Sequence, residues 1–121
     1  MLVHALTTPA LEVCGLLGGH EDRAVSIYPV KNIAPDQSSR FLMDPEQQID
    51  VMRNMRTRGE QFWGIYHSHP FTPATPSARD RQCAAYPDVF YFILSLTDKE
   101  PDIRCYYFDG KDFQEVSVNK Y

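Results

Sequence analysis

The sequence lacks the patterns that mark nucleic-acid-binding, membrane-spanning and secreted proteins. It has no cluster of Lys and Arg, and its formal charge is −4, which argues against nucleic acid or an anionic membrane as the main partner. No apolar run approaches the ~20 residues of a membrane span. The amino terminus has no charged region followed by a long apolar stretch. A cytoplasmic protein is therefore expected.

Cysteine is also scarce. The three cysteines, Cys14, Cys83 and Cys105, are odd in number and widely spaced, and no Cys-x-x-Cys motif occurs. This pattern indicates neither a disulfide framework nor a thiolate zinc site, so reduced and mostly buried thiols are expected. The 121 residues suffice for one core and contain no internal repeat, which predicts a single domain over residues 1–121. The roles of the cysteines and the oligomeric state stay open.

Alternating strand and helix patterns predict an α/β fold of the α+β type, with a mixed sheet and helices on its faces. One predicted strand ends at His69, and the others span residues 11–17, 24–30, 41–43, 89–96, 103–108 and 113–118. The predicted helices span residues 1–6, 44–58 and 75–85. Residues 32–40 are polar and predict a loop. The strand at 89–96 is almost entirely apolar, which is typical of a central strand covered on both faces.

The helix predicted from Asp44 has the clearest start signal. Asp44 is an N-cap residue, Pro45 occupies the first helical position, and Gln47 completes a capping box. The predicted buried face carries Ile49, Met52 and Met55. The opposite face carries three arginines that are expected to be solvated, with docking of an acidic partner as the alternative: Arg53, Arg56 and Arg58.

Two histidines one residue apart, His67 and His69, follow an apolar run. Residues i and i+2 of a strand point to the same face, and Pro70 ends the strand, so both imidazoles are expected at an open strand end. A helix predicted from Thr75 then places Ser77 and Asp80 three residues apart on one face. His67, His69 and Asp80 are three ligands for zinc, with a fourth position left for water, which is typical of a catalytic site.

Plainer interpretations stand beside the zinc site. A His-x-His pair at a strand end is more often surface or hydrogen-bonded polar structure than a metal site. Ser77 and Asp80 also fit an N-cap with an acidic residue in the first helical turn, which serves only the helix start. The joint pattern favours zinc: His-x-His-Pro is followed, after a Pro-rich loop, by Ser-x-x-Asp.

This joint pattern resembles a known family. The segments His67-Ser68-His69-Pro70 and Pro76-Ser77-Ala78-Arg79-Asp80, with Glu12 upstream in Glu-Val-Cys-Gly-Leu-Leu-Gly-Gly, resemble the JAMM metalloprotease motif of the MPN domain. Two further segments resemble the small stand-alone bacterial members of this family: residues 41–47 and 86–96. The resemblance covers nearly the whole chain from Pro9 onwards.

The resemblance implies an MPN (cytidine deaminase-like) domain, with a curved, largely antiparallel sheet flanked by helices. It implies Zn²⁺ as cofactor and a ubiquitin-like sulfur carrier protein as partner. The expected reaction is hydrolysis of the amide bond after the carrier's C-terminal Gly-Gly, in sulfur transfer or in cysteine or thiocarboxylate biosynthesis. Deamination is less favoured because the His-x-Glu and Pro-Cys-x-x-Cys signature is absent.

Glu12 and Ser77 are the expected catalytic residues. A glutamate in an apolar strand is costly to bury without a partner, and the alternative is a strand-edge residue that points to water. The resemblance implies that Glu12 hydrogen-bonds the zinc-bound water and serves as general base, and that Ser77 donates to the oxyanion.

Two other functions are alternatives for the same motif. An isopeptidase that removes ubiquitin-like tags from proteins shares the metal chemistry, and the sequence does not separate the two. A non-catalytic MPN scaffold is disfavoured because all five motif residues are present. For substrate binding, residues 32–43 are expected to present an edge to an extended tail, with Phe41 or Phe71 as a channel wall. The alternative for Phe41 is a core position.

Overall fold

The computed structural model describes residues 1–21, 23–84 and 86–117, with the Cys83 side chain excepted. Its elements are, in chain order, α1 (Leu2–Thr7), β1 (Cys14–His20), β2 (Arg23–Val30), α2 (Pro45–Thr57), β3 (Gln61–His69), α3 (Ala78–Cys83), β4 (Phe90–Ser95), β5 (Asp102–Phe108) and β6 (Phe113–Val116). None of the helices in these ranges is long and apolar enough to cross a membrane.

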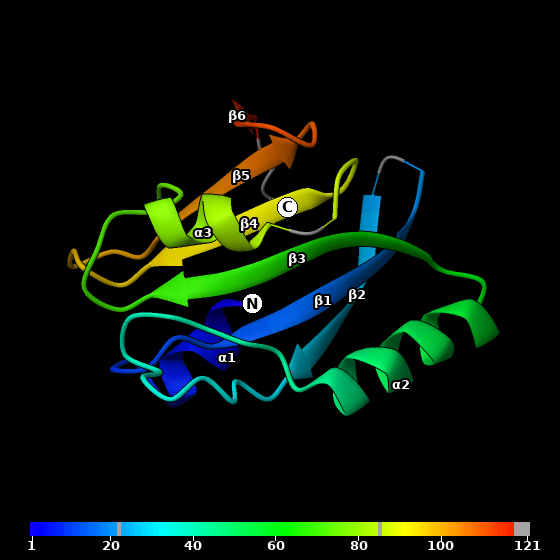
Figure 1. Cartoon of the computed structure of the whole chain (residues 1–121), viewed down its shortest axis with the longest axis horizontal. Coiled ribbons are helices and arrows are strands. Elements are labelled where there is room, and N and C mark those ends of the chain that lie inside the picture. Colours follow the sequence, from blue (N-terminus) through cyan, green and yellow to red (C-terminus); the bar gives the residue numbers. More distant parts are fainter. Residues whose placement is uncertain (22, 85, 118–121) are drawn as a thin grey trace.

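The six strands form one mixed sheet in the order β2-β1-β3-β4-β5-β6 (Figure 1). Every neighbouring pair is antiparallel except β3 and β4, which run parallel. A parallel pair needs a long crossover, and α3 lies in the crossover between β3 and β4. This connection carries α3 back over the sheet, so its first turn lies next to the carboxyl end of β3.

Side chains alternate between two cores along the central strands, as strand geometry requires. Ile65 and Ile93 pack on the face that carries α2 and α3, with Met55 of α2. Tyr66 and Phe92 pack on the opposite face, with Ala5 of α1. Both faces of β3 and β4 are therefore covered, which explains the nearly continuous apolar run of β4.

Tyr66 ties α1 to the sheet. Its hydroxyl lies 2.7 Å from Nδ1 of His4, and its ring is fully buried. The ring occupies the space beside Gly15, where a Cβ atom would come within 2.3 Å of the ring. Glycine is required at this position because any side chain would displace the residue next to His67.

The strands predicted around β1, β2, β4, β5 and β6 are confirmed, with shifted bounds that differ most at β1. β1 begins at Cys14 rather than Leu11 and continues through Gly18 and Gly19 to His20. It continues because β2 and β3 supply ladder partners on both sides of the glycines. The short strand predicted at 41–43 forms only a single bridge, between Asn32 and Met43.

The start of α2 is confirmed at Asp44, whose side chain accepts from the Glu46 backbone N–H. The predicted capping box is wrong, because Gln47 Oε1 instead accepts the Lys31 backbone N–H at 2.7 Å. Ile49 is 57% exposed, which is also contrary to prediction. At 100° per residue the buried stripe runs through Val51, Met52 and Met55, and Ile49 lies beside it rather than on it.

The crossover helix starts later than predicted. Ser77 rather than Thr75 is the N-cap of α3, because Ser77 is extended (φ −78°, ψ 169°) and its side chain accepts from the Asp80 backbone N–H. α3 ends at Cys83, and the predicted end at Ala85 lies outside the described residues. Val118, at the predicted end of the last strand, lies outside them as well.

Candidate functional site

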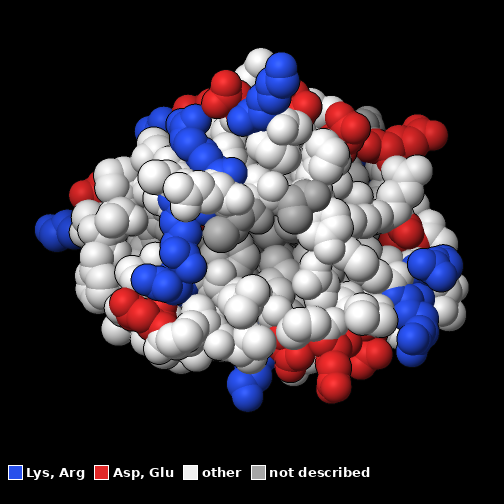
Figure 2. Space-filling view, viewed as in Figure 1, with Lys and Arg blue, Asp and Glu red and all other residues white. Residues whose placement is uncertain are grey.

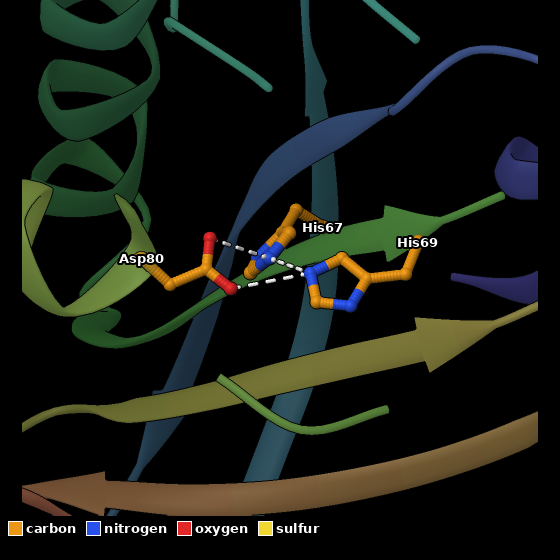
Figure 3. Close-up of side chains that lie close together, drawn as sticks. All are labelled: His67, His69 and Asp80. Atoms are coloured by element: carbon orange, nitrogen blue, oxygen red, sulfur yellow. Dashed lines mark hydrogen bonds and ion pairs between the residues drawn. The ribbon is translucent and has the colours of Figure 1, made fainter. Parts of the chain in front are cut away.

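Three side chains converge at the carboxyl end of β3 (Figure 3). Nε2 of His67 lies 3.0 Å from Nε2 of His69 and 3.2 Å from Oδ1 of Asp80. Nε2 of His69 lies 3.2 Å from Oδ2 of Asp80. The strand parity of the two histidines and the crossover that carries Asp80 therefore bring the three predicted ligands together.

These separations suit a small metal ion. In a tetrahedral zinc site with metal–ligand distances of about 2.0–2.2 Å, neighbouring ligand atoms lie about 3.3–3.6 Å apart. The three distances of 3.0 to 3.2 Å are close to that range. Two buried imidazoles and a carboxylate are also the donor set of open, catalytic zinc sites.

The two histidines are oriented by different contacts. Nδ1 of His69 lies 2.7 Å from the Pro73 carbonyl, which can only accept, so Nδ1 carries the proton and Nε2 of the neutral ring keeps its lone pair for a metal. His67 stacks on Phe41 with ring centroids 4.5 Å apart. Nδ1 of His67 is buried without a hydrogen-bond partner among the described residues, so ring packing is what holds His67.

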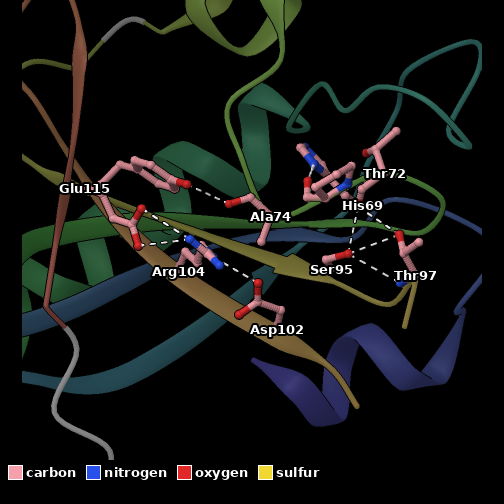
Figure 4. A network of polar contacts seen from close by, with 10 residues as sticks. His69, Thr72, Ala74, Ser95, Thr97, Asp102, Arg104 and Glu115 are labelled. Carbon is pink, nitrogen blue, oxygen red and sulfur yellow. Dashed lines mark hydrogen bonds and ion pairs between the residues drawn. The ribbon is translucent and has the colours of Figure 1, made fainter. Parts of the chain in front are cut away.

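The loop that orients His69 is anchored to β4 and β5 (Figure 4). Ser95 donates to the Thr72 carbonyl at 2.7 Å, and Thr97 donates to the same oxygen at 2.9 Å. The Tyr106 hydroxyl donates to the Ala74 carbonyl at 2.7 Å. Because these bonds bracket Pro73, its carbonyl is held against His69.

Asp80 belongs to the helix cap and to the ligand cluster at once. Ser77 Oγ accepts from the Asp80 N–H at 3.0 Å, and Asp80 Oδ2 accepts from the Ser77 N–H at 2.9 Å. The plainer interpretation of these two residues as a helix start is therefore correct for their mutual bonds. Ser77 is exposed, and its oxygen is the acceptor in the cap, so its own O–H is not used there.

Glu12 is buried with 6% of its surface exposed, so the expectation of a strand-edge residue in water is wrong. It lies just before β1, where its N–H donates to the Gln37 carbonyl at 2.6 Å. Its Oε1 atom is buried and has no hydrogen-bond partner in the described part of the chain. Such an acceptor is costly in a folded protein unless a bound group uses it.

The site gives its titrating groups different pKa values. Burial raises the pKa of Glu12 to about 7, although the nearby His69 opposes this. Burial also disfavours the ionised form of Asp80, but hydrogen bonds from His67 and His69 in their protonated forms outweigh it and hold that pKa well below its usual range. Burial lowers the pKa of His67. Burial also lowers the pKa of His69, but its contacts with Asp80 and the Pro73 carbonyl outweigh this effect, so the pKa is raised overall.

Ser68 positions Glu12, a role that sequence reasoning missed. Its side chain is fully buried on the sheet face opposite the two histidines. Ser68 Oγ accepts the Val13 N–H at 2.9 Å, and the Ser68 N–H donates to the Val13 carbonyl at 3.0 Å. The serine between the ligands therefore fastens the segment of Glu12 to β3, and a polar residue inside an apolar strand was its signal.

Asn32 is a second positioning residue that was not predicted from the sequence. Its Nδ2 donates to the carbonyls of Glu12 and Arg40, at 2.9 and 3.1 Å. Its Oδ1 accepts from the N–H groups of Ala34 and Leu42, both at 3.0 Å. One buried side chain thus joins the Glu12 segment to the loop 32–43. No local pattern predicts this, because three of the four bonds span eight or more residues.

A cavity of about 330 Å³ opens beside His67 and Asp80. Phe41 lines it, as expected of a channel wall, whereas Phe71 is 67% exposed and is not among the lining residues. The described thiols lie elsewhere: Cys14 and Cys105 are free and buried, as expected, and burial raises the pKa of each to about 12. Cys83, whose side chain lies outside the described residues, has no assigned role.

Comparisons with known proteins agree with this geometry. A family model of prokaryotic homologs of the JAB domain matches residues 1–109. The desampylase of Haloferax volcanii is 35% identical over 114 residues, which cover 91% of this chain and 78% of the relative. The CysO-cysteine peptidase of Mycobacterium tuberculosis is 36% identical over 100 residues, covering 81% and 68%. The solution structure of a Desulfitobacterium hafniense protein aligns with a TM-score of 0.87 at 35% identity, covering 98% of this chain and 84% of that one.

Proposed function

This chain belongs to the family of prokaryotic homologs of the JAB domain, and we propose that it is a zinc peptidase acting on ubiquitin-like protein conjugates. The fold is that of the JAB/MPN domain. The relatives named desampylase and CysO-cysteine peptidase support cleavage of such conjugates. The observation that carries the proposal is the convergence of His67, His69 and Asp80 near a buried Glu12 with a free acceptor.

His67, His69 and Asp80 would hold the ion. When bound, zinc acts as a Lewis acid and lowers the pKa of water towards ~7. The protein keeps Nε2 of His69 available through the Pro73 carbonyl and keeps Asp80 ionised through the donors that surround it. These contacts prepare the donor set before any ion binds.

Glu12 is the proposed proton carrier. Its Oε1 takes a proton from the attacking water as the water oxygen bonds to the amide carbon. It then delivers that proton to the amide nitrogen as the carbon–nitrogen bond breaks, which yields a carboxylate and an amine. Ser68 and Asn32 both hold the peptide group between Glu12 and Val13, next to this carboxylate, so they are positioning residues.

Ser77 is the proposed donor to the oxyanion. Its O–H is not used by the helix cap, and Ser77 is exposed. A preorganised donor of this kind is worth about 2.7–4 kcal/mol of barrier lowering in other hydrolases.

The proposed substrate is the C-terminal Gly-Gly tail of a ubiquitin-like sulfur carrier protein. The loop of residues 32–43 lies beside the site, with Phe41 stacked on His67, and would hold an extended tail against the metal. Removal of a ubiquitin-like tag from the lysines of other proteins is the second candidate, favoured by the similarity to the desampylase over 91% of this chain.

The test uses zinc-loaded protein and a carrier with one residue added after its Gly-Gly. Mass spectrometry is expected to show loss of that residue and a carrier that ends in Gly-Gly. A carrier with Ala-Ala at that position is expected to react more slowly, because its methyl groups would crowd the channel beside Phe41. Failure to cleave any carrier, or cleavage at another bond, would overturn the proposal.

A further inference from the structure

The cavity beside the ligand cluster is mostly apolar. Its volume of about 330 Å³ is at the small end for ligand sites, so it holds an amino acid or a dipeptide but not a folded protein. The apolar wall includes Phe41, Met43, Ile65, Ile93 and Phe113. The polar lining groups Gln48 and Tyr86 bond to each other at 2.7 Å.

Two arginines interrupt this apolar wall, Arg40 from the loop and Arg79 from α3. Neither guanidinium forms an ion pair with a carboxylate in residues 1–117 as far as these are described. Nε of Arg40 is buried and has no hydrogen-bond partner. Asp36 bonds to Ser38 and Ser39, and Arg40 is only the smallest of the causes that lower its pKa.

Two other arginines of the chain are paired with carboxylates. Arg81, two residues beyond Arg79 on α3, contacts Asp112 at 3.2 Å, and Arg104 contacts Asp102 at 2.9 Å. Figure 2 shows several basic side chains, in blue, toward the left of this face. The cavity therefore offers two guanidinium groups without a carboxylate partner next to His67 and Asp80, and the buried Nε of Arg40 is costly to leave without an acceptor.

We propose that this cavity binds the leaving group and that Arg40 and Arg79 select one with a free α-carboxylate. The inference rests on the proposed function. In an amino acid attached through its amine, the carboxylate carbon is two bonds from the amide nitrogen, so it falls within the cavity that begins at His67 and Asp80. Guanidinium groups bind carboxylates through paired, charge-assisted hydrogen bonds, and the apolar wall accepts an apolar side chain.

This assignment separates the two candidate functions. A lysine linked through its side chain to a carrier has four methylene groups, and no carboxylate, next to the scissile amide. It would fill the apolar part of the cavity and leave both guanidinium groups unpaired. We therefore expect the protein to cleave carriers that have an amino acid or dipeptide added at the C terminus in preference to carriers linked to a lysine side chain.

The experiment compares three substrates built on one carrier: Gly-Gly-leucine, Gly-Gly-leucinamide, and Gly-Gly joined to the side chain of lysine in a peptide. Zinc-loaded wild type is expected to cleave the free acid with kcat/KM about 10-fold or more above the amide and the isopeptide. Arg79→Gln and Arg40→Gln are expected to lose this preference, with kcat/KM for the free acid falling to about that for the amide. Arg81→Gln is the matched control, because Arg81 lies on α3 with Arg79 but does not line the cavity. This variant is expected to keep the preference for the free acid.

The outcomes distinguish the inference from the proposed function. Equal rates for acid and amide in the wild type overturn the carboxylate site and leave the peptidase standing. If no substrate is cleaved, the proposed function fails. The carboxylate site is then tested separately, by measuring the binding of leucine and leucinamide. NMR of metal-free protein is then expected to show the Nε–Hε signals of Arg40 and Arg79 shifting with leucine and not with leucinamide. Equal responses, or none, overturn the inference.

Discussion

Asp80 and Glu12 are two carboxylates of one site with opposite properties. Asp80 is surrounded by donors: the Ser77 N–H and both histidine rings lie within 3.2 Å of its oxygens. Glu12 is 6% exposed, and its Oε1 has no donor in the described structure. The pKa of Asp80 is accordingly held well below its usual range, whereas that of Glu12 rises to about 7.

The contrast teaches that burial alone does not determine the role of a carboxylate. Burial raises the pKa of both groups, and only the supply of donors reverses the effect at Asp80. A carboxylate that stays ionised suits a cation, and one with an unsatisfied oxygen and a raised pKa suits proton transfer. The different environments of the two carboxylates therefore suit Asp80 to metal binding and Glu12 to proton transfer.

The largest expected effect is that of Asp80→Asn. The amide keeps an acceptor for the Ser77 N–H, so α3 is expected to start as before, but the negative charge between the two rings is lost. Zinc content is expected to fall from about one ion per chain to near zero, and turnover is expected to fall further than in any other variant. Metal analysis after dialysis checks this. Asp112→Asn is the matched control, and full zinc content in Asp80→Asn would contradict the assignment.

Glu12→Gln is expected to affect chemistry without affecting metal content. The amide preserves size and burial but accepts no proton, so turnover is expected to fall by ~10²–10⁴-fold. Steady-state kinetics and metal analysis on the same preparation separate the two carboxylates. Near-normal turnover would mean that another group takes the proton.

Ser77→Ala tests the residue that supports Asp80. The alanine loses the cap, at a cost of about 1 kcal/mol in stability, and also loses the proposed oxyanion donor. Turnover is expected to fall by about 10²-fold with zinc retained. Ser77→Thr keeps both the cap and the hydroxyl and is expected to restore most of the activity. If Ser77→Ala has wild-type kcat, Ser77 serves only the helix start.

The smallest expected effect concerns stability of the metal-free protein. Since the folded-state pKa of Glu12 is about 7 and its ordinary value is 4.5, its protonated form favours the fold below pH 4.5, and this contribution is lost as the pH rises through 7. Asp80 behaves oppositely and loses its contribution only as the pH falls through the acid range.

Urea unfolding at several pH values measures this difference. Between about pH 5 and pH 8 the wild type is expected to lose about 2 kcal/mol relative to Glu12→Gln, because the glutamate titrates in that window and the glutamine does not. The histidines titrate in both proteins, and only the smallest cause of the His69 pKa shift, the charge of Glu12, differs between them. Parallel stability curves would show that Glu12 is not desolvated in solution.

Local patterns predicted much of this protein. Strand parity predicted His67 and His69 on one face, and the strands predicted at residues 103–108 and 113–118 correspond to β5 and β6, which pair in the structure. Ile49 and the capping role of Gln47 were predicted wrongly, because the packing of α2 and the bond to Lys31 depend on segments distant in sequence. The same limit applied to the end of β1 and to the N-cap of α3.

The sequence by itself determined the donor set, because His-x-His-Pro and Ser-x-x-Asp act through strand and helix periodicities that span a few residues. Only the tertiary structure decided the burial of Glu12, the anchoring roles of Ser68 and Asn32, and the two unpaired arginines of the cavity. These features arise where β1, the loop 32–43 and α3 meet over β3. Burial and the supply of hydrogen-bond donors depend on how these segments pack together, so they cannot be predicted from any one segment alone.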